Sequence, residues 1–365
     1  MSATPGTLNL YFPLWCAKFD SDEVGILAPG VACYVPNADE WRTVQKTDVW
    51  MAQWRSGTPS AQGPPPPCCI VVVIDLDRFD SIHAAINAMG PLMLASARDA
   101  VTALRLFRAG WFLDPEQAMY TFYAPSLPIN LLRSPGPYRQ TLISGTDAAN
   151  REAYKLAISD LSQDLAAPGP ITRTWQLLAD YRQAGQSDSV DIAIESFNRS
   201  YGYQLHASSR ASNLFTALDA MLGGMSARRV GKVKINFRGF ARRVETALRF
   251  VESGSVLADA HLEALWLNAQ GRQLRNSLAH SNGQSTEANA AAAFDRLQEV
   301  VRCVLRQYLH FAVHWLTNRE EIAQQLKISS DSQITAAYVK ILEVIQRSAG
   351  ELLYLVQPAN GQKYS

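Results

Sequence analysis

The segment ADAHLEALWLNAQGRQLRNSLAH, residues 258–280, has apolar residues at the three- and four-residue spacing of an amphipathic helix. It ends with Arg275, Asn276 and His280, and the residues SNG at 281–283 follow as a helix stop. Asn276 and His280 are four residues apart, so they share one face of a helix, and the long side chain of Arg275 can reach the same space. The segment therefore predicts a long helix with a polar cluster in its last turns.

Six further segments with helical spacing surround this one, and no proline lies between Pro170 and Pro358. They are residues 150–165, 171–183, 190–203, 211–224, 240–251 and 290–316. Such a succession, joined by short turns, is typical of a helical bundle. We expect an all-helical domain over residues 150–325, with its core at about 195–318, and a C-terminal helical extension over residues 326–365.

The first 145 residues have a different pattern. Short apolar runs at 9–15, 30–36 and 68–76, bounded by Pro, Gly or Asp, predict strands, and the last of them, CCIVVVIDL, predicts a buried one. Residues 81–110 predict a helix that is broken near Gly90 and Pro91. The GPPPP run at 63–67 predicts an exposed loop, and residues 133–150 predict a linker. The predicted fold class is α+β, with a mixed α/β domain at 1–145 before the all-α bundle.

Composition excludes several classes of protein. The chain has 365 residues, of which 47% are hydrophobic and 18% are charged, so it predicts an ordered globular protein. Its net charge of +1 gives no overall attraction to nucleic acid or to a membrane. The five cysteines show no CxxC spacing, and no window has 18 consecutive apolar residues. We expect a cytoplasmic protein with free thiols, no metal, no cofactor and no membrane span.

Positive charge is concentrated in one part of the chain. Residues 201–310 contain 14 Lys or Arg and 8 Asp or Glu, a local balance of +6. Seven of these basic residues are candidates for binding RNA phosphates: Arg228, Arg229, Lys232, Lys234, Arg238, Arg242 and Arg243. A solvated helix face would have the same composition, so both interpretations stay open.

The Arg–Asn–His cluster predicts phosphodiester chemistry without a metal. His280 lies near the C-terminal end of its helix, where the helix dipole favours the imidazolium and raises its pKa towards neutrality. A histidine that titrates near pH 7 suits general acid–base catalysis. The Arg275 guanidinium stays charged and can bind two oxygens of a phosphate. The alternative is a structural histidine that caps the last carbonyls of the helix.

LRNSLAH at 274–280, in the third long helix of a predicted bundle, resembles the HEPN superfamily. The signature of that superfamily is an arginine, a polar residue, three to five further residues and a histidine. TALRLFRAG at 102–110 and ALDAMLGG at 217–224 extend the resemblance to the Apea-like HEPN branch. The resemblance implies a metal-independent endoribonuclease acting on single-stranded RNA. In such enzymes the ribose 2′-hydroxyl attacks the adjacent phosphate and leaves a 2′,3′-cyclic phosphate and a 5′-hydroxyl.

The resemblance also implies roles for individual residues. His280 would be the acid–base residue, Arg275 would stabilise the transition state and Asn276 would orient the reacting group. Asp219 matches an acidic position in the first bundle helix and would anchor Arg275. Two such motifs usually face each other across a homodimer, for which the helices at 256–281 and 286–316 could supply the face. The chain departs from some HEPN toxins at Asn282, where those proteins have a tyrosine that partner enzymes modify.

The family further implies a setting in antiphage defence or a toxin-like stress response, in which the N-terminal domain binds a regulatory protein or ligand. Two alternatives stay open. The bundle could be a non-catalytic nucleotide-binding, RNA-binding or dimerisation module. Alternatively, Asp75 and Asp77, at the end of a predicted strand, could bind Mg²⁺ in a cyclic-nucleotide enzyme.

Overall fold

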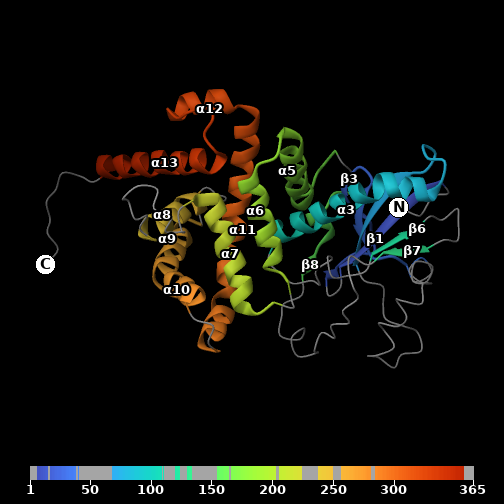
Figure 1. The fold of residues 1–365 in the computed structure, drawn as a ribbon, viewed down its shortest axis with the longest axis horizontal. Helices are drawn as coiled ribbons and strands as arrows, with labels where there is room; N and C mark the ends of the chain where they lie inside the picture. The colour runs from blue at the N-terminus through green and yellow to red at the C-terminus, as the bar shows by residue number, and fades with distance from the viewer. Residues whose placement is uncertain are drawn as a thin grey trace. The chain divides into compact units, whose positions relative to one another are not determined.

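The computed structural model describes residues 6–14, 17–37, 40, 68–108, 110, 120–123, 130–133, 154–163, 166–202, 205–223, 237–249, 256–280 and 284–356 (Figure 1). The chain divides into two compact units, Met1–Ala179 and Asp180–Ser365. The first contains an antiparallel sheet and the second is helical, which confirms the predicted α+β class. The loop expected at 63–67 and residues 134–150 of the expected linker lie outside the described residues.

The first unit is built on a six-stranded sheet with the order β3-β4-β5-β1-β6-β7, in which every neighbouring pair is antiparallel. The strands are β1 (Thr7–Leu14), β3 (Gly25–Ala28), β4 (Val31–Tyr34), β5 (Cys68–Asp75), β6 (Tyr120–Tyr123) and β7 (Asn130–Arg133). Central strands β1 and β5 pair from Thr7 opposite Asp75 to Leu14 opposite Cys68. Both strands are buried on both faces over most of their length, which explains why their sequences are mostly apolar and do not alternate with polar residues. The strands expected from the three apolar runs are confirmed.

Helix α3 (Ile82–Phe107) packs against β1 and β5. It begins at Ser81, whose hydroxyl accepts a hydrogen bond from the Ala84 N–H at 3.1 Å. The predicted break near Gly90 and Pro91 is wrong, because α3 continues through both residues. Pro91 is on the exposed side of the helix, where its ring faces solvent and the carbonyl that loses its donor can bond water.

Residues 154–163 do not form the helix that their spacing predicted. They form β8 (Lys155–Leu156), which pairs in parallel with β2 (Lys18–Phe19), and a 3₁₀ turn, η1 (Ile158–Asp160). The Lys18 N–H donates to the Tyr154 carbonyl at 2.8 Å, and a bridge joins Ile26 to Ser162. Backbone pairing with residues 18–26 therefore overrides the helical pattern. It also places residues 154–163 in the first unit, so the unit boundary lies about 30 residues after the predicted one.

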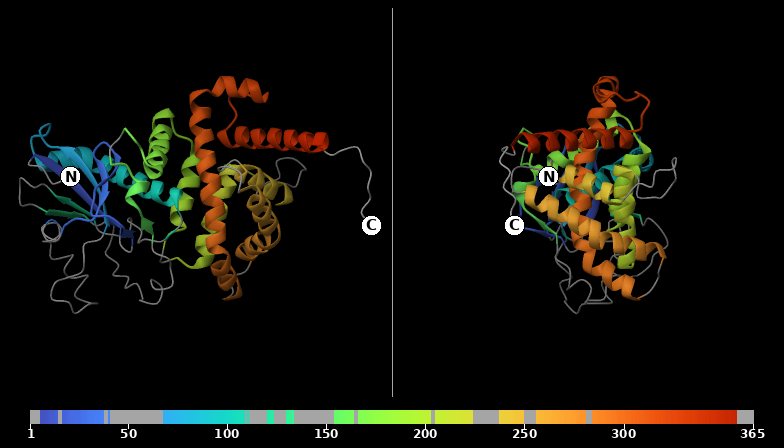
Figure 2. Two further views of the ribbon diagram at one scale, coloured as in Figure 1. Left: turned by 180° about the vertical axis from the view of Figure 1, so that it is seen from behind. Right: turned by 90° about the vertical axis from the view of Figure 1, so that its left-hand side faces the viewer.

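The helical unit follows α5 (Pro170–Ala184), which crosses the boundary between the two units. Its elements are α6 (Asp188–Arg199), α7 (Ala207–Leu222), α8 (Phe237–Leu248), α9 (Val256–Trp266), the π-helical segment η2 (Leu267–Gly271), α10 (Arg272–His280), α11 (Gln284–Thr317), α12 (Arg319–Leu326) and α13 (Ile334–Val356). Figure 2 shows α11, in orange, extending through the whole bundle. It packs against α6, α7, α8, α10, α12 and α13.

Helix α11 owes this central place to a buried stripe at helical spacing. The stripe residues are at most 5% exposed: Ala290, Phe294, Leu297, Val301, Leu305, Tyr308, Ala312 and Trp315. Burial of large apolar side chains along about seven helical turns makes this helix a large contributor to the hydrophobic stabilisation of the bundle.

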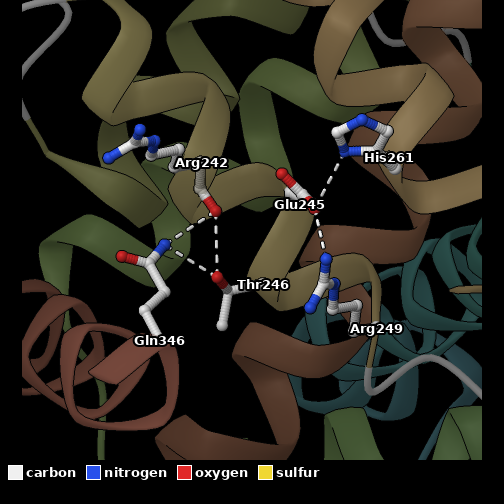
Figure 3. A network of polar contacts seen from close by, with 6 residues as sticks. All are labelled: Arg242, Glu245, Thr246, Arg249, His261 and Gln346. Atoms are coloured by element: carbon white, nitrogen blue, oxygen red, sulfur yellow. Dashed lines mark hydrogen bonds and ion pairs between the residues drawn. The ribbon is translucent and has the colours of Figure 1, made fainter. Parts of the chain in front are cut away.

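Helix α13, which lies in the predicted extension at 326–365, and α12 before it are both in the helical unit. Helix α13 packs against α7, α8 and α11. Its Gln346 donates from Nε2 to the Arg242 carbonyl at 2.8 Å and to the Thr246 hydroxyl at 2.7 Å, and thereby attaches α13 to α8 (Figure 3). None of the helices in the described part of the chain is long and apolar enough to cross a membrane.

Candidate functional site

Helices α9 and α10 and the π segment between them form one helical run over residues 256–280, as the sequence predicted. Its buried side is formed by Ala260, Ala264, Leu267, Gly271 and Leu274. At Gly271 a Cβ atom would lie 2.7 Å from Cδ1 of the buried Leu267, so the absence of a side chain permits the close packing here. Single π turns inside α-helices recur at functional sites, and this one directly precedes the Arg–Asn–His cluster.

Polar contacts with α11 hold this run in place. Arg296 of α11 donates from Nε to Glu263 at 2.7 Å, and its guanidinium carbon lies 4.7 Å from the centre of the Trp266 ring. The indole N–H of Trp266 in turn donates to Gln270 at 2.8 Å. The ion pair and the cation–π contact together restrict α9 just before the π segment.

The structure brings two of the predicted site residues to one place. Arg275 of α10 and Asp219 of α7 line the same cavity. Only the resemblance had led us to expect these two residues near each other. Asn276, the next residue of α10, is exposed. His280 is the last residue of α10, and its side chain lies outside the described part of the chain.

The cavity has a volume of about 410 Å³ and opens to solvent. It lies among α6, α7 and α10, and its lining residues are Ile192, Ser212, Phe215, Thr216, Asp219, Ala220, Arg275, Leu278 and Ala279. Ser212, Thr216 and Asp219 are spaced by four and three residues, so they form one polar stripe along α7. Arg275, Leu278 and Ala279 have the matching spacing on α10. The cavity is therefore a groove between two facing helix surfaces.

One wall of the cavity is apolar. Phe215 is only 5% exposed, and Leu278 is half-buried. Ile192 of α6 is 45% exposed, which leaves a large apolar side chain at the edge of the opening. An apolar wall with a few convergent polar groups is the usual character of a site for a small organic ligand.

The polar side of the cavity carries two opposite charges. Burial lowers the pKa of Arg275, and the negative charge of Asp219 acts in the opposite direction. The ordinary pKa of arginine is so high that the guanidinium stays charged at neutral pH despite the lowering. Arg275 is thus a permanent cation at the wall of an open cavity, and Asp219 lies close enough to influence it.

Helix α7, which carries the polar stripe, is fixed at both ends by side chains from other helices. At its N-terminal end the Glu287 carboxylate of α11 accepts the N–H groups of Ala207 and Ser208 at 2.5 and 3.0 Å. Burial alone would raise the pKa of Glu287, but these hydrogen bonds outweigh it and the pKa is lowered. The arrangement caps α7 from a residue that is 80 positions away.

At the C-terminal end of α7, Arg243 donates to the carbonyls of Leu222 and Gly223 at 2.9 and 2.8 Å. Its guanidinium also pairs with Glu343 at 3.5 Å. Its side chain is only 18% exposed, so Arg243, a predicted RNA-binding residue, has a structural role at this helix end.

The remaining residues of the predicted basic surface are differently placed. Arg242 is exposed, and in Figure 3 its guanidinium points away from the network that its own carbonyl joins. The structure describes Arg238 only by its backbone, at the start of α8. The other four predicted residues, Arg228, Arg229, Lys232 and Lys234, lie outside the described residues.

Asp75 and Asp77 occupy a strand end. The N–H of Asp77 donates to the Asp75 carboxylate at 2.9 Å, which closes the turn after β5. In the described ranges, no group of three or more His, Cys, Asp or Glu residues could hold a metal ion.

The sequence did not predict the apolar wall. Ile192, Phe215 and Leu278 come from three helices, and their meeting depends on how those helices pack. The spacing of Ser212, Thr216 and Asp219 on one face of a helix whose other face is apolar was the available signal, because polar residues on one face indicate a surface that is not part of the core.

Comparisons of the chain with protein-family models, with curated proteins and with solved structures find no match.

Proposed function

We propose that the helical unit is a metal-independent endoribonuclease of the HEPN type that cleaves single-stranded RNA. The observation that supports this most is the position of Arg275, which belongs to the RNSLAH motif and lines an open cavity opposite Asp219. A permanently charged guanidinium can bind two oxygens of a phosphate and stabilise the charge that develops on it.

In the proposed reaction the ribose 2′-hydroxyl loses its proton to a base and attacks the adjacent phosphorus. The bond from phosphorus to the 5′-oxygen breaks, and that oxygen receives a proton from an acid. His280 has the chemistry for both proton transfers. Arg275 would stabilise the pentavalent phosphorane, Asn276 would orient the substrate and Asp219 would hold Arg275.

A second copy of the chain would supply the second histidine. The exposed side of α9 carries two large apolar residues, Leu262 and Leu265, which are 55% and 52% exposed. Ala269 and Asn276 follow at helical spacing and are also exposed. An apolar stripe that leads to the motif suits a two-fold interface, in which the same face of each protomer meets the other.

The setting in antiphage defence or a toxin-like stress response, with regulation through the first unit, is part of this proposal and is supported by the resemblance of LRNSLAH to HEPN proteins. A non-catalytic nucleotide- or RNA-binding module is the second candidate. The cavity supports this alternative as well, since an arginine beside a carboxylate and an apolar wall can bind a nucleotide without cleaving it.

The test is cleavage of single-stranded RNA in excess EDTA, with the 3′ ends of the products mapped. We expect cyclic phosphate ends for the wild type and a loss of at least about 100-fold in His280→Ala, because acid–base catalysis contributes roughly 10²–10⁴-fold. His83→Ala is the matched control, since His83 is an exposed residue of α3 in the first unit.

The activity of Arg275→Ala should also be lost, whereas Arg347→Ala, at an exposed position of α13, should keep it. Equal cleavage by wild type and His280→Ala would show that the motif is a structural helix end. RNA binding without cleavage by the wild type would favour the non-catalytic module.

A further inference from the structure

The cavity combines an acceptor-rich polar stripe with an apolar wall, and this combination points to a particular ligand. We propose that the cavity binds a guanine base of the RNA strand and that Asp219 selects this base through its Watson–Crick edge. The inference rests on the proposed function, because it assumes that an RNA strand binds at this site. It adds which base of that strand the site prefers.

The shape and the apolar wall of the cavity suit one nucleobase. A volume of about 410 Å³ lies within the range of sites that enclose small organic ligands. Phe215 and Leu278 offer apolar surface to the flat faces of a base. The 45% exposed Ile192 would lose apolar surface to water when a base enters, which favours binding.

The polar stripe on α7 accepts hydrogen bonds. An ionised aspartate has only acceptors. The Thr216 hydroxyl donates its own proton to the Ser212 carbonyl at 3.0 Å, so its oxygen offers only lone pairs to the cavity. The Ser212 hydroxyl can donate or accept. A ligand edge with two adjacent N–H donors is therefore the complement of the Asp219 carboxylate, with Thr216 as a further acceptor.

Guanine has such an edge, because its N1–H and its N2 amino group lie side by side and can both donate to one carboxylate. Adenine and cytosine place an acceptor ring nitrogen next to their amino group, and uracil places its single N–H between two carbonyls. Each of these three bases would bring at least one acceptor against the Asp219 carboxylate. Two well-placed hydrogen bonds to one base edge discriminate by roughly tenfold to a hundredfold against the wrong base.

Arg275 makes the carboxylate compatible with an anionic strand. Asp219 alone would repel a phosphate, whereas the guanidinium beside it on α10 compensates the charge and can bind the phosphate of the same nucleotide. In this arrangement the base enters the groove, and its phosphate lies at Arg275.

The first experiment measures equilibrium binding of GMP, AMP, CMP and UMP to the full chain in EDTA, by titration calorimetry. We expect GMP to bind at least about tenfold more tightly than the other three, a preference that Asp219→Asn removes. Asp295→Asn, which makes the same change on an exposed face of α11, should keep the preference. Equal affinity for the four nucleotides, or a guanine preference that persists in Asp219→Asn, would overturn the proposal.

A second pair of variants tests the cavity without changing its charges. Ala279→Phe should fill the groove and weaken GMP binding by about tenfold or more, whereas Ala292→Phe, at an exposed position of α11, should not. Circular dichroism of all four variants separates loss of binding from loss of fold. Unchanged GMP binding by a folded Ala279→Phe protein would place the ligand elsewhere.

The second experiment maps cleavage of oligonucleotides that contain one G, A, C or U in an otherwise uniform strand. Cleavage next to guanine, reduced in Asp219→Asn relative to Asp295→Asn, is the expected result. Cleavage without base preference would contradict this inference and leave the nuclease proposal intact. Binding of GMP without any cleavage would contradict the nuclease proposal alone. A preference for GMP that is absent from RNA cleavage would make a free guanine nucleotide the ligand and overturn the assignment to the strand.

Discussion

Replacement of Glu287 by alanine should destabilise the helical unit, because this carboxylate caps a helix to which it does not belong. Helix α7 begins after His206, whose side chain makes no capping hydrogen bond. Glu287 of α11 instead accepts the N–H groups of Ala207 and Ser208. Without it, two donors in the first turn of α7 would depend on water.

The size of the effect follows from those two bonds. A hydrogen bond to a charged group contributes about 1.5–3 kcal/mol, and loss of a helix N-cap costs about 0.5–2 kcal/mol. The side chain of Glu287 is 40% exposed, so water screens the charge and can replace part of the interaction. We therefore expect Glu287→Ala to lower the free energy of unfolding by about 1–2 kcal/mol.

The pH dependence gives a second test of the same cap. The folded-state pKa of Glu287 is lowered, so its stabilisation is complete above its unfolded pKa, which is about 4.3, and is lost as the pH falls through the folded value. The gap in unfolding free energy between wild type and Glu287→Ala should be present from pH 5 to 7 and shrink below about pH 4.

Urea denaturation followed by circular dichroism measures this gap. The control is Glu195→Ala, since Glu195 forms an exposed ion pair with Arg199 that should contribute at most about 0.5 kcal/mol. Equal stability of the two variants at pH 7, or a gap for Glu287→Ala that does not shrink in acid, would refute the capping role.

Three further predictions concern other parts of the chain. Gly169→Ala should destabilise the first unit by about 1–3 kcal/mol, because its Cβ would lie 2.3 and 2.7 Å from two backbone carbonyl oxygens. Gly239→Ala, whose Cβ would meet no atom within 4 Å, should instead stabilise α8 by up to about 1 kcal/mol, and urea denaturation measures both effects. Arg243→Ala should lower the unfolding free energy by about 1–3 kcal/mol through loss of its bonds to the end of α7, and Arg242→Ala by less than about 0.5 kcal/mol. Burial raises the pKa of Cys303 to about 11, so at pH 8 iodoacetamide should alkylate it more slowly than a free cysteine. Mass spectrometry of the peptide that contains Cys303 measures this rate, and a rate equal to that of free cysteine would contradict the prediction.

The sequence predicted those elements whose patterns depend on burial alone. The run at 68–76 became a central strand because it is covered on both faces, and residues 258–280 became a helix whose apolar stripe packs into the bundle. It failed at residues 154–163, whose helical spacing was overruled by pairing with residues 18–26, more than 120 positions away. Such pairing leaves no trace in a local pattern.

The candidate site could also be predicted only in part from the sequence. The motif pointed to Arg275, and the resemblance added Asp219, and these two residues do line one cavity. The contribution of Ile192 could not be predicted, because an exposed isoleucine near the middle of α6 has no local feature that distinguishes it from a core residue. Its position at the edge of the cavity depends on how α6 packs beside α7 and α10.

Three arginines of the helical unit show why the position of Arg275 favours a functional role. Arg210 is 7% exposed, donates to the Ser200 carbonyl at 2.6 Å and lies 3.8 Å from the centre of the Phe294 ring. Arg243 donates to two carbonyls at the end of α7. Both guanidiniums are enclosed by protein groups that satisfy them, as burial of a charge requires.

Arg275 has a different position, because it lines an opening of about 410 Å³ that a ligand can enter. Its partial burial carries a desolvation cost, which lowers its pKa. A cation that is partly desolvated and still reachable interacts more strongly with an incoming anion than one in bulk water does. The geometry of this arginine thus supports a phosphate-binding role by an argument that does not depend on His280. Substitution of Arg275 should therefore weaken binding of GMP even where cleavage is absent.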